Sequence, residues 1–515
     1  MMVYVARYLF ITVKSQGKKM IQTRVVLAAM AATFLIGGCA VTATPVTTEE
    51  LVTQSQTDLA EIFKGQEAIE APISLHEAMA RALKYNLDQR LKLMEEALAR
   101  GDLDVMRYDL LPELTVSAGY NYRNNEPGAS SESLLSGAIS LEPSKSVERD
   151  YWDANAIMTW NLLDFGVSYV RNQQQANEVL VMQERSRKVA QNVIQDVRYA
   201  YWKAVSAQQL LPEMDDLLEQ TEDALENSKQ LETLRLQAPL KPLRYQKSLL
   251  DLIGRLWRLR EDLSSAKTDL AALINIRPGT YFELADNEDN LIEDALPIYT
   301  PVSELEELAL LQRPELIEEN YKRRISTLEV RKAMLSMFPG LEFSLGKNHQ
   351  ENEFLWNNTW TGAAAGITWN IFNLLSGPAR MEQARTQGEL DDIRRMALSM
   401  AVLTQVQLAY QRYHLAIKNN QIAVQQSDVE SRIKKHIISG QKASREHALA
   451  VLRAQTSSMV SRMRRHVAHA EVQNSMGRLQ NSIGYDPLPR GIKDESIASL
   501  AESIKIRLDQ APVKL

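Results

Sequence analysis

The sequence contains an internal duplication, and this restricts the possible fold more than any other feature of the chain. Residues 75–119 align with residues 302–346 at an offset of 227 residues, and residues 159–201 align with residues 368–410 at an offset of 209. The first copy therefore has 18 additional residues, the difference of 227 and 209, between positions 124 and 150. This stretch is rich in Ser, Gly, Glu and Pro, which is typical of a solvated surface loop. The chain must fold as two similar halves.

Each copy contains the same order of predicted elements. A first helix is predicted at about 75–109 and again at about 302–337, and Pro112 and Pro339 end these helices. Two strands with period-two alternation follow in each copy, and then a long helical hairpin. The strands are expected at about 112–125, 151–163, 339–349 and 359–372, and the hairpins at about 168–275 and 379–483. The predicted class is mostly α with a small β part.

The predicted strands have the length of membrane-spanning strands. Leu114 and Val116 alternate with small polar residues such as Ser117 and Gly119. About 9–11 residues are enough for a tilted strand to cross a bilayer. Aromatic rings favour the membrane–water interface, and three tryptophans lie at predicted strand ends: Trp152, Trp160 and Trp369. A soluble hairpin packed on a helical core is the alternative, because the barrel pattern is weak in each single segment.

Four membrane strands cannot close a barrel with an aqueous lumen, since even eight strands enclose an interior that side chains fill. An open sheet would expose unpaired backbone groups to lipid, which is energetically forbidden. We therefore expect a trimeric tube in which three copies contribute twelve strands and twelve long helices. The small polar faces of the strands, with Ser117, Gly119, Ser344 and Gly346, would line its lumen.

The long helical stretches are predicted to form coiled coils. Val189, Val193, Val197 and Tyr201 follow the i, i+4, i+8 spacing of an amphipathic helix. About 70 helical residues extend roughly 100 Å at 1.5 Å per residue. Breaks at residues 238–242 and 439–440 turn each stretch into a hairpin of two antiparallel helices, which we expect to pack as a coiled coil.

The first residues have the pattern of a lipoprotein signal peptide. Basic residues at positions 18–24 precede an apolar run of about a dozen residues, which is too short to span a bilayer as a helix. Cys39, the only cysteine, follows the expected cleavage residues Ile36, Gly37 and Gly38, and its thiol is expected to take the lipid. A plain secretory signal with an incidental cysteine is the alternative.

Two further residues refine this prediction. Met20 is a better-placed start than Met1, because residues 1–19 would make an unusually long leader. Ala40 follows the cysteine, where an aspartate is the usual signal for retention in the inner membrane. The expected location is therefore the outer membrane.

Composition excludes several other classes of protein. The 59 Lys and Arg residues against 65 Asp and Glu residues give a net charge of -6, so no basic surplus indicates nucleic-acid binding. No stretch after Cys39 has 18 uninterrupted apolar residues, so the sequence predicts no transmembrane helix after the signal. Only 21 Gly, 17 Pro and 6% aromatic residues favour long helices over a large sheet.

With these features together, the chain resembles the TolC family of outer-membrane channel proteins, in its lipidated branch. The resemblance extends from about Ile73 to Pro487. The resemblance rests on the duplication and on four motifs. These motifs are Leu-Pro at 111–112, Phe-Pro at 338–339, Trp-Asn-Leu-Leu-Asp-Phe-Gly at 160–166, and Gly440 followed by Val-Leu-Arg-Ala-Gln at 451–455.

The resemblance implies a homotrimeric exit duct that connects an inner-membrane pump and a periplasmic adaptor protein to the outside. It implies no catalysis and no cofactor other than the acyl lipid on Cys39. The tips of the helical hairpins would dock the adaptor in the periplasm and open a constriction. The tip residues implied are Leu236, Pro239, Leu240, Gly440 and Ser444.

The sequence departs from the family pattern at the second tip. The family often carries acidic residues around the Val-Leu pair that form a constricting ring, whereas this chain has Ala450 and Arg453 there. A ring of three arginines in a narrow pore would favour anions. The alternative is that Arg453 lies exposed on a helix that faces the adaptor.

The sequence offers no defensible catalytic constellation. It contains no glycine-rich phosphate loop, no Gly-x-Ser-x-Gly elbow and no HExxH motif, and we do not expect an enzyme. His466 and His469 are spaced to bind a metal from one helix. The neighbouring Arg464 and Arg465 oppose a cation, so a solvated helix face is the favoured interpretation.

These observations divide the chain into five segments: a signal peptide at 1–38, a lipidated extension at 39–72, repeat 1 at 73–300, repeat 2 at 301–487 and a tail at 488–515. The favoured function is a duct for small-molecule efflux, and a duct for type I protein secretion remains open. A lipid-anchored periplasmic coiled-coil scaffold is the alternative from another class of protein, because it would not need strands of bilayer length.

Overall fold

The computed structural model describes residues 43–130, 132–133, 135–140, 142–233, 240–285, 298, 300–440, 445–487 and 496–511. The chain divides into two compact units, Met1–Lys64 and Gly65–Leu515. In the smaller unit, helix α3 (Thr48–Ile62) begins with a capping box between Thr47 and Glu50. All further elements belong to the larger unit.

The boundary between the units lies eight residues before the one that we predicted between residues 72 and 73. Residues just after Lys64 are already bonded to the larger unit. Gln66 Nε2 donates to the Asn275 carbonyl, and the Glu67 N–H donates to the Tyr85 hydroxyl. These bonds explain why residues 65–72 group with the larger unit.

Each predicted first helix is in fact two helices. They are α4 (Leu75–Tyr85) and α5 (Leu87–Met106) in the first copy, and α9 (Val302–Gln312) and α10 (Pro314–Leu335) in the second. Asn86 separates the first pair, and its Oδ1 accepts from the N–H groups of Asp88 and Gln89 to cap α5. Arg313 separates the second pair with ψ 124, since the residue before a proline avoids the helical region.

The long hairpins begin at the strands. α6 (Leu162–Thr233) has 72 residues and α11 (Phe372–Ser439) has 68, which corresponds to about 100 Å each at 1.5 Å per residue. The returning helices are α7 (Leu240–Ser264), α8 (Ala266–Leu273) and α12 (Arg445–Ser482), and α13 (Ile497–Asp509) follows near the C-terminus. No helix in the described part of the chain has both the length and the apolar character that crossing a membrane requires.

Four antiparallel strands form one sheet in the order β1-β4-β5-β6. They are β1 (Glu113–Tyr122), β4 (Asp150–Asn161), β5 (Gly340–Gln350) and β6 (Thr359–Thr368). The 3-10 helix η1 (Arg107–Leu110) precedes β1, and the extra loop of the first copy carries a small hairpin of β2 (Gly128–Ala129) and β3 (Ser144–Lys145). The two hairpins predicted from the duplication thus lie side by side in one sheet.

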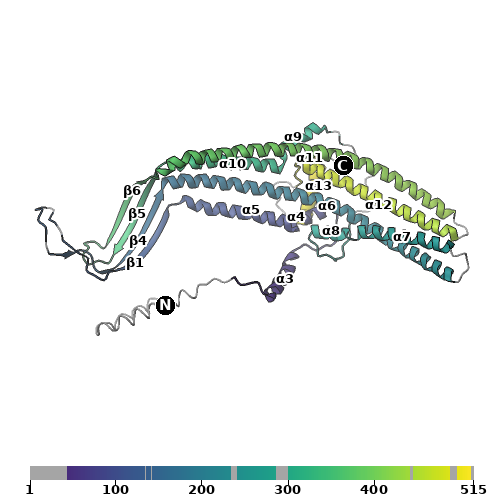
Figure 1. Cartoon of the computed structure of the whole chain (residues 1–515), viewed down its shortest axis with the longest axis horizontal. Helices are drawn as coiled ribbons and strands as arrows, with labels where there is room; N and C mark the ends of the chain where they lie inside the picture. The colour runs from purple at the N-terminus through teal and green to yellow at the C-terminus, as the bar shows by residue number, and fades with distance from the viewer. Residues whose placement is uncertain are drawn as a thin grey trace. The chain divides into compact units, whose positions relative to one another are not determined.

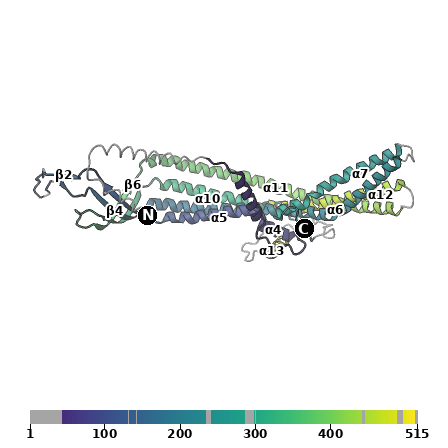
Figure 2. The ribbon, with the colours of Figure 1, turned by 90° about the horizontal axis from the view of Figure 1, so that it is seen from below.

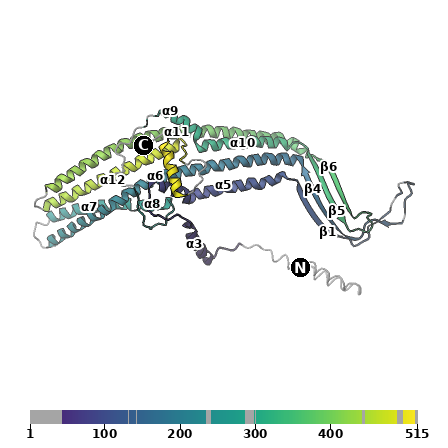
Figure 3. The ribbon, with the colours of Figure 1, turned by 180° about the vertical axis from the view of Figure 1, so that it is seen from behind.

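Helices continue the strands in the same lateral order (Figure 1). α5 leads into β1, β4 leads into α6, α10 leads into β5, and β6 leads into α11. Next to the sheet, α6 packs between α5 and α10, and α10 packs against α11. Beyond α4 and α9 the hairpins α6–α7 and α11–α12 lie side by side, with α12 against α6 (Figure 3). The long helices of the larger unit therefore form a wall, with α11 along one edge and α5 and α7 along the other, and the short helices α4, α8 and α13 pack against it.

Three apolar cores hold this wall together. One joins α6 to α4, α8 and α13 around Tyr201, and a second joins α11 and α12 to α9 around Tyr413. The third lies between α6 and α7 and reaches Leu452 of α12. Figure 2 shows α4 and α13 lying against the helices near the middle of the unit. The two middle cores are the duplicated halves of the sequence, packed side by side.

Candidate functional site: the strand sheet and the helical tips

The register of the sheet places apolar residues on one face. Directly paired residues share a face in an antiparallel sheet. One such row runs Leu114–Met158–Leu345–Ala363, and a second runs Val116–Ala156–Lys347–Thr361. Leu114 and Val116 are 68% and 73% exposed in the single chain. An apolar face with this exposure needs a nonaqueous partner along its length.

The opposite face is polar and built from small residues. Its rows include Ser117–Asn155–Asn348–Trp360 and Thr115–Ile157–Gly346–Gly362. Ser117 Oγ donates to Asn155 Oδ1 at 2.8 Å, which links two neighbouring strands. The predicted lumen residues Ser117, Gly119, Ser344 and Gly346 all lie on this face.

The three predicted interface tryptophans lie at the ends of strands, each in a different contact. Trp152 is near the loop end of β4, with its ring 5.1 Å from that of Tyr120. Trp160 is near the helical end of the same strand, edge-on to Phe165 at 5.9 Å. Trp369 follows β6 directly, and its Nε1 donates to the Met337 carbonyl at 3.0 Å. The rings bracket the sheet at both ends.

The structure describes only some of the predicted tip residues. Leu240 is the first residue of α7 and is 60% exposed, and Gly440 caps the end of α11. Leu236, Pro239 and Ser444 lie outside the described residues, as do Cys39 and the predicted cleavage residues Ile36, Gly37 and Gly38.

Ala450 and Arg453 are both exposed on α12 near the second tip. Arg453 Nη2 donates to Ser248 Oγ of α7 at 3.0 Å, so Arg453 bridges the two hairpins of one chain. Next to it Leu452 is buried in the core that α7 shares with α6. This contact between the hairpin tips could not be derived from the sequence.

Two edges of the wall carry exposed apolar stripes, which the sequence analysis did not identify. On α7, Leu243, Leu250 and Trp257 are exposed at intervals of seven residues, and on α11 the same holds for Leu415, Ile422 and Val429. Closer to the sheet, exposed apolar residues recur on α5 and α11: Leu91, Met94 and Leu98, and Leu390, Ile393 and Met400. A seven-residue apolar repeat is the signature of a coiled-coil seam, so the spacing itself could have revealed these stripes.

His466 and His469 are not on a solvated helix face, so that prediction was wrong. Each is only 1% exposed, because α12 is packed between α6 and α11. The ring of Trp202 on α6 lies edge-on to His469 at 4.4 Å. Burial, together with the positive charges of His466 and Arg465, lowers the pKa of His469 to about 4. In the described part of the chain, no group of three potential ligands could hold a metal ion.

The buried His469 predicts a dependence of stability on pH. Its pKa is lowered from 6.5 to about 4 in the folded chain, so the unfolded chain binds the proton more tightly. Stability is therefore full above about pH 6.5 and falls as the pH drops towards 4, by about 3 kcal/mol per chain. We expect His469→Phe to flatten the fall in melting temperature across this range. Equal slopes for the variant and the parent protein would contradict this.

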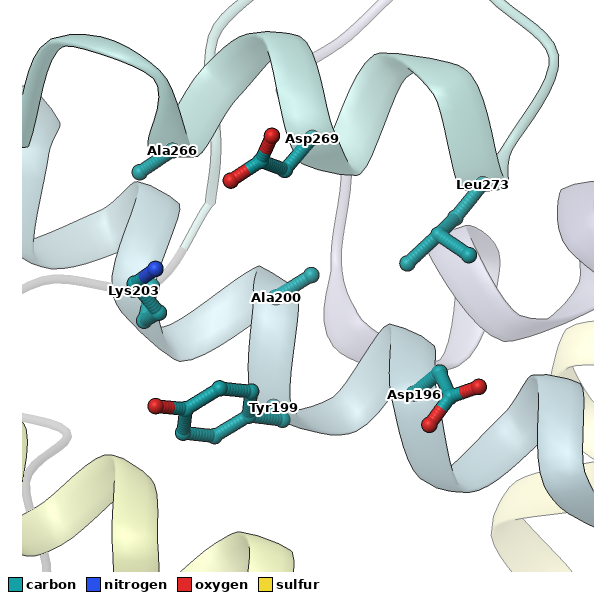
Figure 4. A pocket seen from close by; sticks show the side chains of 7 residues that line it. All are labelled: Asp196, Tyr199, Ala200, Lys203, Ala266, Asp269 and Leu273. Atoms are coloured by element: carbon teal, nitrogen blue, oxygen red, sulfur yellow. The ribbon is translucent and has the colours of Figure 1, made fainter.

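A groove of about 210 Å³ lies between α6 and α8, and Figure 4 shows the side chains that line it. Asp196 and Lys203 come from α6 and Asp269 from α8. Burial raises the pKa of Asp196, although the charge of Arg478 partly opposes this shift. Among the described residues, no hydrogen bond joins the side chains around this groove, so it does not hold a nucleophile and its base as a pair.

Comparison with known proteins identifies the fold. No family model and no curated protein matches the sequence. Among solved structures, the outer-membrane channel OprN matches with a TM-score of 0.60 and 19% identity, covering 80% of this chain and 89% of that one. The open state of the Neisseria gonorrhoeae MtrE outer membrane channel matches with a TM-score of 0.59 and 18% identity, covering 80% of this chain and 88% of that one. The Campylobacter jejuni CmeC outer membrane channel matches with a TM-score of 0.59 and 13% identity, covering 86% of this chain and 94% of that one.

The chain therefore has the TolC-like fold, which it shares with these outer-membrane channels. At these identities the likeness establishes the architecture, and the function must be argued from the residues of this chain.

Proposed function

We propose that this chain is the outer-membrane exit duct of a tripartite export system. As a homotrimer it would pass substrates from an inner-membrane pump, through a periplasmic adaptor, to the outside. The observation that carries this proposal is the four-stranded sheet, which has an exposed apolar face, a polar face and unpaired outer strands. Three solved structures that are similar to it, OprN, MtrE and CmeC, are outer-membrane channels.

The edges of the sheet support the trimer. β1 and β6 each pair with a strand on one side only. In a bilayer the free backbone groups of such edges cost several kcal/mol each, so the sheet must be closed by other strands. If β6 of one copy pairs with β1 of the next, three copies close a twelve-stranded barrel. The apolar face then meets lipid and the polar face lines water.

The helices support the same arrangement. α5 continues the edge strand β1 and α11 continues the edge strand β6, and both carry exposed apolar residues. Further from the sheet, the stripes on α7 and α11 provide a second pair of matching edges. A neighbouring copy that joins β6 to β1 therefore also covers the helical stripes. One lateral contact thus buries every unpartnered apolar edge of the wall.

We propose that the lipid on Cys39 anchors the chain to the outer membrane and that the tips at Leu236–Leu240 and Gly440–Ser444 dock the adaptor. Ala450 and Arg453 would border the aperture without an acidic ring, which favours anions over cations. We propose small molecules as the cargo. Protein secretion through the same duct remains the second candidate, since the pump selects the cargo.

Conductance and extraction test the proposal together. We expect the purified protein to form stable single channels in planar bilayers. We also expect Cys39→Ala protein to stay in the membrane after carbonate and urea washing, because its strands span the bilayer. A lipid-anchored scaffold would give no channels and would lose its attachment with Cys39→Ala. Release of the variant by carbonate would thus contradict the duct and support the scaffold.

A further inference from the structure

A basic cavity of about 200 Å³ lies where α6, α11, α12 and the junction of α9 and α10 meet. Four positively charged side chains line it: Lys188, Arg313, Arg412 and Arg478. They come from α6, the α9–α10 junction, α11 and α12 respectively, so tertiary packing alone brings them together. The amide of Gln195 also lines the cavity, and its Nε2 can donate to a ligand. The amide of Asn481 is already used within the protein, because its Oδ1 accepts from Lys188 Nζ and its Nδ2 donates to Asn192 Oδ1 and Gln195 Oε1.

One carboxylate partly balances these charges. Glu315 Oε1 lies 3.0 Å from Lys188 Nζ and 3.0 Å from Arg313 Nη2. The remaining donors of Arg313 are bonded within the protein, to the Gln405 amide oxygen and to the Ser482 carbonyl. Arg313 is therefore a satisfied structural residue, and Glu315 is already shared by two cations.

Arg412 and Arg478 have no such carboxylate. Across the residues that the structure describes, neither forms an ion pair. Asp196 feels the charge of Arg478 without pairing with it. Both guanidinium groups thus line the cavity with donors to spare, beside two further cations, and the acids that act on these four charges are Glu315 and Asp196.

Lys188 is buried beside the cavity. Burial lowers the pKa of this ammonium group; the charge of Glu315 opposes the shift, and the weaker effect of Arg313 adds to it. The lowered pKa indicates that removal from water destabilises the charged form of Lys188. An anion in the cavity would stabilise that charged form, because it would pair with several cations at once.

We propose that this cavity binds a small multivalent oxyanion of the phosphate class. The planar guanidinium groups of Arg412 and Arg478 match two oxygens each, which is the geometry that arginine uses for phosphate. Lys188 supplies a point charge, and the amide nitrogen of Gln195 supplies a neutral donor. The site belongs to a single chain and does not depend on the proposed duct function.

Phosphate titration of the purified full-length protein in detergent tests the site. At constant ionic strength, we expect inorganic phosphate to raise the melting temperature and to give saturable heat on titration, whereas chloride should do neither. Arg412→Gln and Arg478→Gln each remove a charge-assisted pair and should weaken phosphate binding about tenfold. Both residues are exposed on their helices, so the variants should fold.

Arg464→Gln is the matched control. Arg464 is exposed on α12, two heptads before Arg478 on the same side of the helix, and lies outside the cavity. This variant should bind phosphate as the parent protein does. The proposal is overturned if phosphate has no effect at constant ionic strength, or if Arg464→Gln weakens binding as much as Arg478→Gln does.

Discussion

Ile422→Lys combined with Val429→Lys should convert the trimer into monomers. Both residues are exposed in the single chain and belong to the seven-residue stripe of α11. In the proposed trimer this stripe packs against the stripe of α7 in the neighbouring copy. α7 carries more basic than acidic residues between Leu240 and Ser264, so each new lysine would be buried next to like charges. Burying an unpaired charge costs several kcal/mol, and the trimer repeats this cost at three seams.

The mass of the detergent-solubilised protein, measured by light scattering after gel filtration, reports this change. Ser439→Lys serves as the control, because it adds a lysine at an exposed position of α11 outside this stripe. The control should remain a trimer. A double variant that stays trimeric would show that the α11 stripe is not a seam between copies.

Gly484→Val should strongly destabilise the folded chain. Gly484 ends α12 with φ +73, and a Cβ there would lie 2.7 Å from the backbone nitrogen of Arg313. The left-handed backbone costs about 1–2 kcal/mol for a residue with a side chain. Overpacking against a fixed backbone adds about 1–3 kcal/mol. The clash also displaces Arg313, whose guanidinium bonds to the Ser482 carbonyl and to Glu315.

Gly279→Val separates the cost of the left-handed backbone from the cost of the clash with Arg313. Gly279 has φ +85, but a Cβ added there would have nothing within 4 Å. This variant should therefore show only the smaller backbone cost, measured as the drop in melting temperature. If both variants lose the same stability, the close approach of Gly484 to Arg313 does not add to the destabilisation, and this prediction is wrong.

The strands and long helices were predictable because their signals are local. Alternation over ten residues and the i, i+4, i+8 spacing of an amphipathic helix depend only on neighbours along the chain. The duplication then indicated that each element occurs twice. The prediction of a signal peptide and of lipidation at Cys39 also depends on a short stretch, which lies outside the described residues.

The errors in local structure have local causes. Asn86 and Arg313 lie inside continuous helical patterns, but a side-chain cap and the following proline end the helix at these two positions. A helical prediction that depends on apolar periodicity misses such breaks, since the periodicity continues on either side.

Burial of polar residues could not be predicted. The surroundings of α12 indicate why: its sequence is polar, yet it packs between α6 and α11, so His466 and His469 are buried. Sequence periodicity identifies the apolar face of a helix, but it does not show how many other helices pack against the polar faces.

The sequence alone determined the two-fold repeat, because the two copies can be aligned with each other. It also determined the strand and helix types and the alternating faces of the strands, because each of these depends on residues close together in the chain. Only the tertiary structure decided the strand order β1-β4-β5-β6, the contact of Arg453 with Ser248 and the meeting of Lys188, Arg313, Arg412 and Arg478. These features join residues that are tens to hundreds of positions apart. Such contacts depend on how whole helices pack against one another, and no short stretch of the sequence predicts that packing.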